Sequence, residues 1–98
     1  MTAKDRTEHL LDVALDMAAD IGIDNLTRDG IADAAGVSHC LVTFRLGQKT
    51  ELLRNVMRRA IKKENLAVLA QGLARNDKVA AKATPDLKQR AAAWLAQR

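Results

Sequence analysis

Hydroxyl and cationic side chains gather in one short segment, residues 27–49, and decide what chemistry that segment can support. Two hydroxyl residues, Thr27 and Ser38, stand where helices are expected to begin, and two cationic residues, Arg28 and Lys49, lie beside or beyond them. Hydroxyl groups, cations and the backbone N–H groups of helix starts are the usual protein partners of phosphate oxygens. These residue types therefore suit the binding of a phosphate-bearing molecule better than bond-breaking chemistry.

The residues that enzymes need are scarce or unsuitably spaced. The sequence has one cysteine and two histidines, and it shows no glycine-rich phosphate loop and no Ser-His-Asp pattern at usable spacing. With so few Cys and His residues, a structural zinc site is not expected either. A redox or nucleophilic role for Cys40 is disfavoured, because no histidine stands in a suitable arrangement beside it. We therefore predict a protein that is not an enzyme and that carries no cofactor and no metal.

Composition favours packed helices in a small protein. Of the 98 residues 48% are hydrophobic, but the only aromatic ones are Phe44 and Trp94, so aliphatic side chains and alanine must build the core. No apolar run approaches the roughly 20 residues that span a bilayer, and no signal peptide is evident, so we expect no membrane association and a cytoplasmic location.

Positive charge is concentrated late in the chain. Residues 1–50 hold five Lys or Arg and eight Asp or Glu, whereas residues 51–98 hold eleven and four.

Hydrophobic periodicity and capping residues predict an all-α fold. Three helices are expected first, over residues 3–20, 27–36 and 39–45. A much longer fourth helix is expected from about residue 48, with a break near 72–83, and a last helix is expected from Thr84 onward. Gly22 is expected to be a left-handed cap of the first helix, and Gly72 is expected to weaken the helix that contains it. Residues 1–47 would form a three-helix module, and residues 48–98 a helical dimerisation region.

Two stripes of like charge run along the predicted helices at a spacing of four residues. One is acidic and lies on the first helix (Asp12, Asp16 and Asp20), and the other is basic and lies on the fourth (Arg54, Arg58 and Lys62). A stripe of this kind is usually a solvated helix face, and we interpret both in this way. The alternatives are an acidic docking surface on the first helix and an extended nucleic-acid footprint on the fourth.

Residues 27–45 have the layout of a helix-turn-helix. Two short helices are expected on either side of a tight turn, in which Gly36 can take a positive φ angle and Val37 can enter the core. Small alanine residues before the turn allow the two helices to approach closely. The second helix would then fit the major groove of DNA, which is about 12 Å wide, with its first side chains facing the base edges.

This segment and its flanks resemble the tetracycline-repressor-like (TetR) family of bacterial transcriptional regulators. The resemblance covers residues 6–56, about half of the chain, and extends over four helices. The matching positions are residues 10–22, Leu26, Thr27, Ile31, Ala32, residues 34–38, Gly47, Lys49, Glu51, Leu52 and Leu53. The resemblance implies a helix-turn-helix module that binds double-stranded DNA.

The resemblance also implies roles for individual side chains. Contacts to DNA phosphates are expected from Thr27, Arg28, Ser38 and Lys49, and contacts to base edges from His39, Cys40, Thr43, Phe44 and Arg45. Arg45 could instead bind a phosphate, and Phe44 could instead be a core residue. The family commonly has glycine where this chain has Cys40 and tyrosine where it has Thr43, so the target sequence is left open.

The expected partners are a DNA operator and a second copy of the chain. One half-site gives limited affinity, which favours a homodimer that reads an inverted repeat. The expected interface lies on the fourth and last helices, with apolar side chains that a lone subunit would leave exposed (Leu66, Leu69, Leu87, Trp94 and Leu95). Repression by exclusion of RNA polymerase is implied by the resemblance alone.

The chain has little room for the effector-binding domain that members of this family usually carry. We therefore expect no enclosed ligand pocket and no small-molecule effector. Two other functions remain open. One is a helical protein-interaction module whose degenerate helix-turn-helix no longer reads DNA, and the other is charge-driven DNA packaging without sequence preference.

Overall fold

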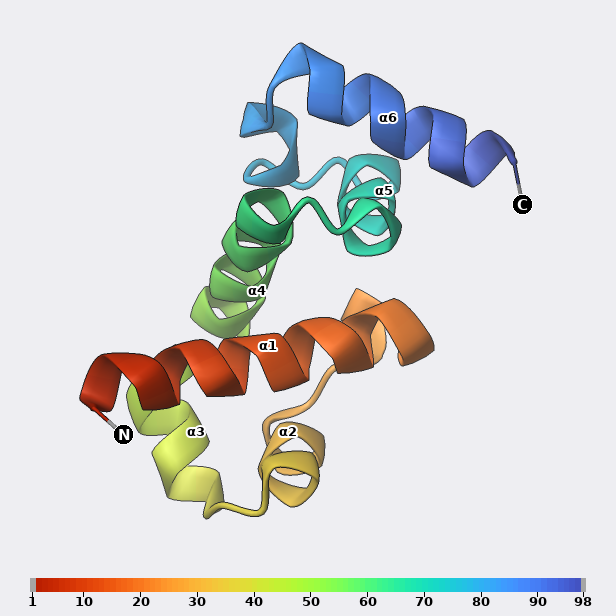
Figure 1. The fold of residues 1–98 in the computed structure, drawn as a ribbon. Coiled ribbons are helices and arrows are strands. Elements are labelled where there is room, and N and C mark those ends of the chain that lie inside the picture. Colours follow the sequence, from red (N-terminus) through yellow and green to blue (C-terminus); the bar gives the residue numbers. More distant parts are fainter. Residues whose placement is uncertain (1, 98) are drawn as a thin grey trace.

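The computed structural model describes residues 2–97 and contains only helices and their connections over this range. The elements in chain order are α1 (Ala3–Ile21), the 3₁₀-helix η1 (Ile23–Asn25), α2 (Arg28–Ala35), α3 (His39–Leu46), α4 (Lys49–Lys63), α5 (Leu66–Ala74), the 3₁₀-helix η2 (Ala80–Lys82) and α6 (Pro85–Ala96). The predicted all-α fold is confirmed. Figure 1 shows α2 and α3 on one side of α1, α5 and α6 on the other, and α4 running between the two sides.

Side-chain caps explain where three of these helices begin. The hydroxyls of Thr27, Ser38 and Thr84 each accept a backbone N–H from three residues further along, at 3.0 to 3.2 Å. Each such cap satisfies a donor that the helix itself leaves unpaired and contributes about 1 kcal/mol. The predicted starts of α2, α3 and α6 are therefore confirmed.

Two glycines end helices in different ways. Gly36 has φ 71° and ψ 35°, which is the left-handed conformation expected for the turn after α2. Gly22 also has a positive φ, of 94°, but its ψ of 141° is extended rather than left-handed. The prediction of a left-handed cap at Gly22 is therefore wrong, because the chain leaves α1 in an extended step that leads directly into η1.

The predicted long fourth helix is wrong, because α4 ends at Lys63. Glu64 adopts a left-handed conformation with φ 55°, and the N–H of Asn65 donates to the carbonyl of Ala60 at 2.8 Å. The Asn65 side chain then caps α5 by accepting the N–H of Val68 at 3.1 Å. A left-handed residue is usually glycine, so the glutamate at position 64 gave no sign of this break.

One apolar core joins the helices on both sides of α1. Leu69 of α5 and Leu87 of α6 are buried in this core, so the prediction that a lone subunit exposes them is wrong. The short α5 folds back against α6, and this packing covers side chains that a continuous fourth helix would have exposed. Of the other residues expected at an interface, Leu66 and Trp94 are partly buried, and Leu95 is 52% exposed.

An ion pair fastens α1 to α4 across the core. Arg59 is only 8% exposed, and its Nε and Nη2 donate to the two carboxylate oxygens of Asp12 at 2.9 and 3.1 Å. These hydrogen bonds lower the pKa of Asp12 and raise that of Arg59, although burial opposes both shifts. The acidic stripe is thus a solvated face at Asp16 and Asp20, as expected, but not at Asp12.

Gln71 ties α5 to the end of α1. Its amide oxygen accepts the N–H of Ile23 at 2.7 Å, and its amide nitrogen donates to the carbonyl of Ala18 at 3.1 Å. The N–H of Ile23 lies just beyond the end of α1 and finds its acceptor in this side chain, whereas the Ala18 carbonyl also accepts the N–H of Gly22 at 2.9 Å. None of the helices in the described range 2–97 combines the length and apolar character needed to cross a membrane.

Candidate nucleic-acid interface

The helix pair α2–α3 turns most of its apolar side chains inward, with Phe44 as the exception on the outer face of α3. Ile31 and Ala32 of α2 and Val42 and Leu46 of α3 are almost completely buried. The connection is short, and the N–H of Val37 donates to the carbonyl of Ala32 at 3.0 Å. This packing fixes the angle between the helices and leaves the outer face of α3 open to solvent.

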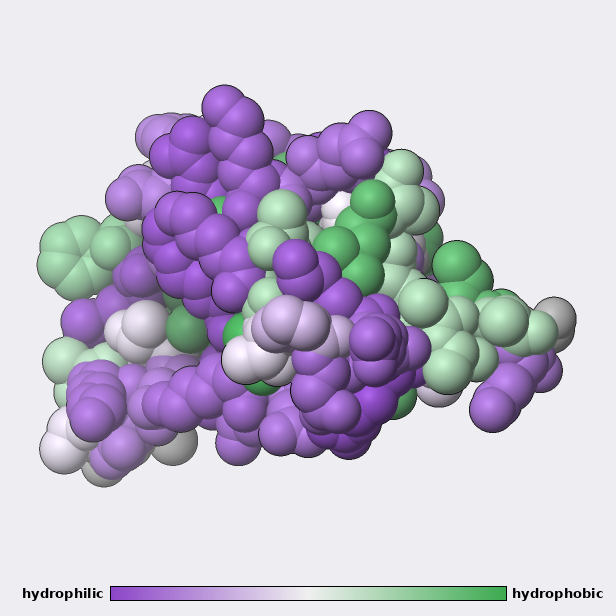
Figure 2. All heavy atoms as spheres, turned by 90° about the horizontal axis from the view of Figure 1, so that it is seen from above, coloured by the Kyte–Doolittle hydropathy of each residue, from purple (hydrophilic) through white to green (hydrophobic). Residues whose placement is uncertain are grey.

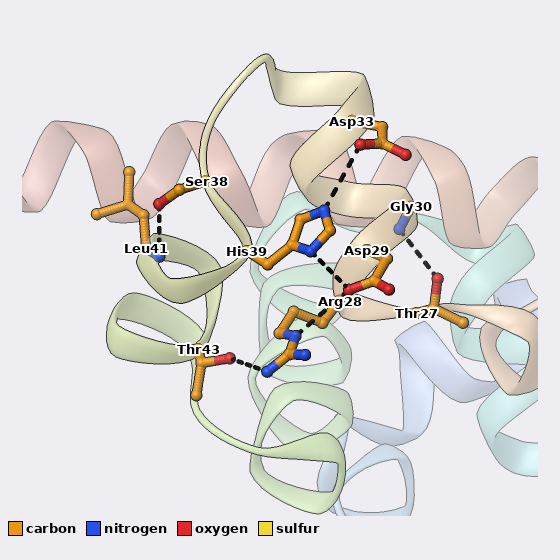
Figure 3. Close-up of polar contacts among 9 residues, drawn as sticks. All are labelled: Thr27, Arg28, Asp29, Gly30, Asp33, Ser38, His39, Leu41 and Thr43. Carbon is orange, nitrogen blue, oxygen red and sulfur yellow. Dashed lines mark hydrogen bonds and ion pairs between the residues drawn. The ribbon is translucent and has the colours of Figure 1, made fainter.

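A cluster of predicted phosphate-binding side chains lies where α2 and α4 begin. Arg28 reaches from α2 to α3, where its Nη1 donates to Oγ1 of Thr43 at 3.1 Å (Figure 3). Lys49, at the first position of α4, donates from Nζ to the carbonyl oxygen of Leu26. All three side chains approach one cavity of about 230 Å³ (lined by Arg28, Thr43, Gly47, Gln48, Lys49 and Leu52). Two helix starts and two cations thus converge on one concave surface, which suits an anion.

His39 opens α3 between two carboxylates of α2. Its Nδ1 lies 3.2 Å from Asp29 and its Nε2 lies 3.7 Å from Asp33, so the ring stands between the two acids (Figure 3). A neutral imidazole can donate to only one of them, whereas a protonated ring can donate to both. The side chain is about half exposed, so an incoming molecule can reach it from the solvent side.

The outer face of α3 carries the remaining predicted base-contacting residues. Cys40 is exposed, and Phe44 is 76% exposed, which excludes the alternative that Phe44 belongs to the core. The guanidinium of Arg45 lies 5.0 Å from the centre of the Phe44 ring, a distance at which cation and ring attract each other. The Nε of Arg45 is buried and has no hydrogen-bond partner among the described residues.

The predicted site residues therefore fall into three neighbouring groups. Arg28, Thr43 and Lys49 share one cavity. Thr27 and Ser38 act as helix caps in this structure, so their hydroxyls already accept backbone N–H groups. The third group occupies the remaining surface of α3 (His39, Cys40, Phe44 and Arg45).

Sequence reasoning missed the two carboxylates against His39. Asp29 and Asp33 are four residues apart on α2, a spacing that places both on one helix face. That signal was present, but it points to His39 only once the angle between α2 and α3 is known. Arg28 also lies 3.5 Å from Asp29, so negative charge accompanies the cations on this surface.

The surroundings of the site hold no cluster suited to a metal. Among residues 2–97, no group of three His, Cys, Asp or Glu side chains is arranged to hold a metal ion.

Comparison of the chain with protein-family models, with curated proteins and with solved structures finds no match. The geometry of α2, α3 and α4 is therefore the basis for any functional proposal.

Proposed function

We propose that the chain is a sequence-specific, double-stranded DNA-binding protein of the TetR-like kind, which acts in the cytoplasm as a transcriptional regulator. In this proposal α3 enters the major groove. The observation that carries it is the outer face of α3, where Phe44 and Cys40 are exposed while Val42 and Leu46 on the inner face are buried. A short helix held rigidly from behind and open in front is the geometry that major-groove reading requires.

The cations beside α3 support the proposal. Arg28 and Lys49 lie at the starts of α2 and α4, next to Thr43 of α3. Phosphate contacts on the flanks of a recognition helix fix its register on the duplex, and the base-edge contacts then supply specificity. Arg45 can donate two hydrogen bonds to one guanine once it leaves the Phe44 ring.

The proposal includes a homodimer that reads an inverted repeat and represses transcription from an overlapping promoter. Hydrophobic residues gather on the side of the molecule where α6 ends (Figure 2). On this side Leu95 is exposed beside a shallow hollow of about 200 Å³ between α5 and α6. Pairing through this surface would give two recognition helices, whose spacing in the dimer has to match one helical turn of DNA, about 34 Å.

One observation favours a second candidate, a protein-interaction module. Asp29 and Asp33 place two exposed carboxylates beside α3, and carboxylates repel phosphates. An exposed aromatic side chain such as Phe44 is also common at protein–protein interfaces. In this reading the pair α2–α3 docks on a protein rather than in a groove.

The deciding experiment is the selection of bound duplexes from a random DNA library at physiological salt, about 0.15 M, followed by sequencing. An enriched inverted repeat is the expected result. Enrichment of a single half-site would support sequence-specific DNA binding but contradict the homodimer. Light scattering would check the oligomeric state independently. DNA retained without any enrichment would indicate charge-driven binding. If no DNA is retained, the protein-interaction module takes the place of the proposal.

A further inference from the structure

A second cavity adjoins the first on the far side of Lys49. It has a volume of about 300 Å³, which is the lower end of the range for small-ligand sites. Its walls come from the first turns of α4 and from the segment that follows α5 (Lys49, Thr50, Leu53, Arg54, Arg75, Asp77, Lys78 and Val79). Two segments that are distant in sequence therefore form one concave surface.

The charge of this second cavity is strongly positive. Four of its residues are cationic, and only Arg75 among them has a carboxylate partner in the described range, Asp24 at 2.8 Å. The one acidic residue of the cavity, Asp77, uses its Oδ1 to accept the N–H groups of Val79 and Ala80. The other three cations (Lys49, Arg54 and Lys78) pair with no carboxylate of residues 2–97.

An anion would relieve the repulsion between these cations. Like charges that line one cavity repel each other, and the repulsion is stronger near a protein surface than in bulk water. The start of α4 adds to the attraction, because Gln48 makes no side-chain capping bond and the first backbone N–H groups of the helix carry partial positive charge. Arginine, lysine and free helix N–H groups together are suited to the oxygens of a phosphate group.

Lys49 lines both cavities, so the positive surface is continuous from α2 and α3 to the segment after α5. A single small anion would need only one of the two cavities, whereas a chain of regularly spaced phosphates can occupy both. From this continuity we propose that the second cavity binds a backbone phosphate of the duplex on which α3 rests, beyond the half-site itself. This inference rests on the proposed function and extends its footprint to Arg54 and Lys78.

The test removes two cavity cations and compares the result with a matched loss of charge elsewhere. The variant is Arg54→Gln with Lys78→Gln. The control is Lys62→Gln with Lys63→Gln, which removes the same charge at the opposite end of α4, about 20 Å from the first turn. Circular dichroism and thermal unfolding establish that both variants fold as the unmodified chain does.

The affinity of each protein for the selected operator is then measured over a series of KCl concentrations. Each lost phosphate contact lowers the slope of log K against log salt by about 0.9, so the cavity variant, which loses its contact to one phosphate, should lose about 0.9 per subunit, and the control almost nothing. Shortening the duplex to the operator alone should abolish the difference between the cavity variant and the unmodified chain, because the flanking phosphates are then missing. Equal slopes on the long duplex for the cavity variant and the unmodified chain would overturn the assignment to DNA.

A titration with inorganic phosphate, against sodium chloride at equal ionic strength, separates a free phosphate from a DNA phosphate. The backbone amide NMR signals of Thr50 and of residue 78 should shift with phosphate in the unmodified chain but not in the cavity variant. This result would support phosphate binding in the cavity even if the two proteins have equal salt slopes on DNA. If neither DNA nor phosphate distinguishes the cavity variant, the inference fails. If the unmodified chain binds no DNA at all, the proposed function fails, and the phosphate titration alone decides whether the cavity is an anion site.

Discussion

The two helix pairs on opposite sides of α1 are built alike on the inside and differ on the outside. Both contribute aliphatic side chains to the common core, such as Val42 of α3 and Leu69 of α5, which are fully covered. On the side of α5 and α6, a buried glycine, Gly72, lets α5 approach Met57 of α4 and Ala80 of η2 closely. In α2–α3 the outer face keeps Phe44 exposed and holds His39 against two acids. Under the proposed function, recognition therefore falls to the α2–α3 end, while both ends contribute to the stability of one core.

The largest effect should come from opening the core at the α5–α6 end. Leu69→Ala removes a completely buried side chain and should lower the free energy of unfolding by about 2 to 5 kcal/mol, measured by urea denaturation. Leu95→Ala is the control, because Leu95 is mostly exposed and a lone subunit should lose less than about 0.5 kcal/mol. A cost for Leu95→Ala that grows with protein concentration would instead place Leu95 in a dimer interface.

Two glycines sharpen the comparison, because they are needed for different reasons. A Cβ on Gly72 would lie 2.4 Å from Cε of Met57 and 2.8 Å from Cβ of Ala80, so Gly72→Ala should cost about 1 to 3 kcal/mol through overpacking. A Cβ on Gly36 meets nothing within 4 Å, but the left-handed conformation there should make Gly36→Ala cost about 1 to 2 kcal/mol.

Asparagine separates these two causes in the same unfolding measurement. It tolerates the left-handed conformation, so Gly36→Asn should cost less than Gly36→Ala. It is larger than alanine, so Gly72→Asn should cost more than Gly72→Ala. An opposite order at either position would show that the cause assigned to that glycine is wrong.

The proposed DNA-binding surface is tested by two cations with different expected roles, one on α3 and one at the start of α4. Arg45→Ala should cost about 1 to 3 kcal/mol at one base pair and relax the preference there, as measured by competition between operator variants. Lys49→Ala should weaken binding to all sequences about equally and lower the salt slope by about 1. If both substitutions leave affinity and preference unchanged, the binding surface lies elsewhere on the molecule.

Local signals in the sequence predicted most of the fold but not its long-range pairs. Helix starts at Thr27, Ser38 and Thr84 were predictable because a cap depends on residues only three positions apart. The break after α4 was not predictable, because Glu64 adopts the left-handed conformation that is normally found at glycine. Gly72 was interpreted as a helix breaker, although it lies inside α5 and permits close packing.

For the candidate site the residues come from the sequence and stay a prediction, and the structure adds which of them lie together. Arg28, Thr43 and Lys49 were selected separately, and their shared cavity follows from the angle between α2, α3 and α4. That angle depends on the whole core, which no local pattern encodes. The cations after α5 were missed for the same reason, since Lys78 reaches the start of α4 only when α5 folds back.

The ion pair between α1 and α4 should give the smallest effect and a distinct pH signature. Asp12→Asn should lower the free energy of unfolding by only about 1 kcal/mol at neutral pH, because the Asp12 side chain is 45% exposed and water screens the pair. The pKa of Asp12 is lower in the folded protein than in the unfolded chain. Its contribution is therefore complete above the ordinary carboxyl pKa of about 4 and disappears as pH falls through the lower folded value.

The stability difference between the unmodified chain and Asp12→Asn, measured by urea denaturation at a series of pH values, should accordingly be constant near neutrality and shrink below about pH 4. Asp16→Asn is the matched control, because Asp16 lies one turn along the same stripe, is exposed, and makes no ion pair within the described residues. A difference that persists unchanged in acid would mean that Asp12 acts through packing rather than charge. In that case the charge of Asp12 adds nothing to stability, and α1 and α4 are held by the aliphatic core and by the pairing of Arg59 with Glu8, which lies 3.8 Å away.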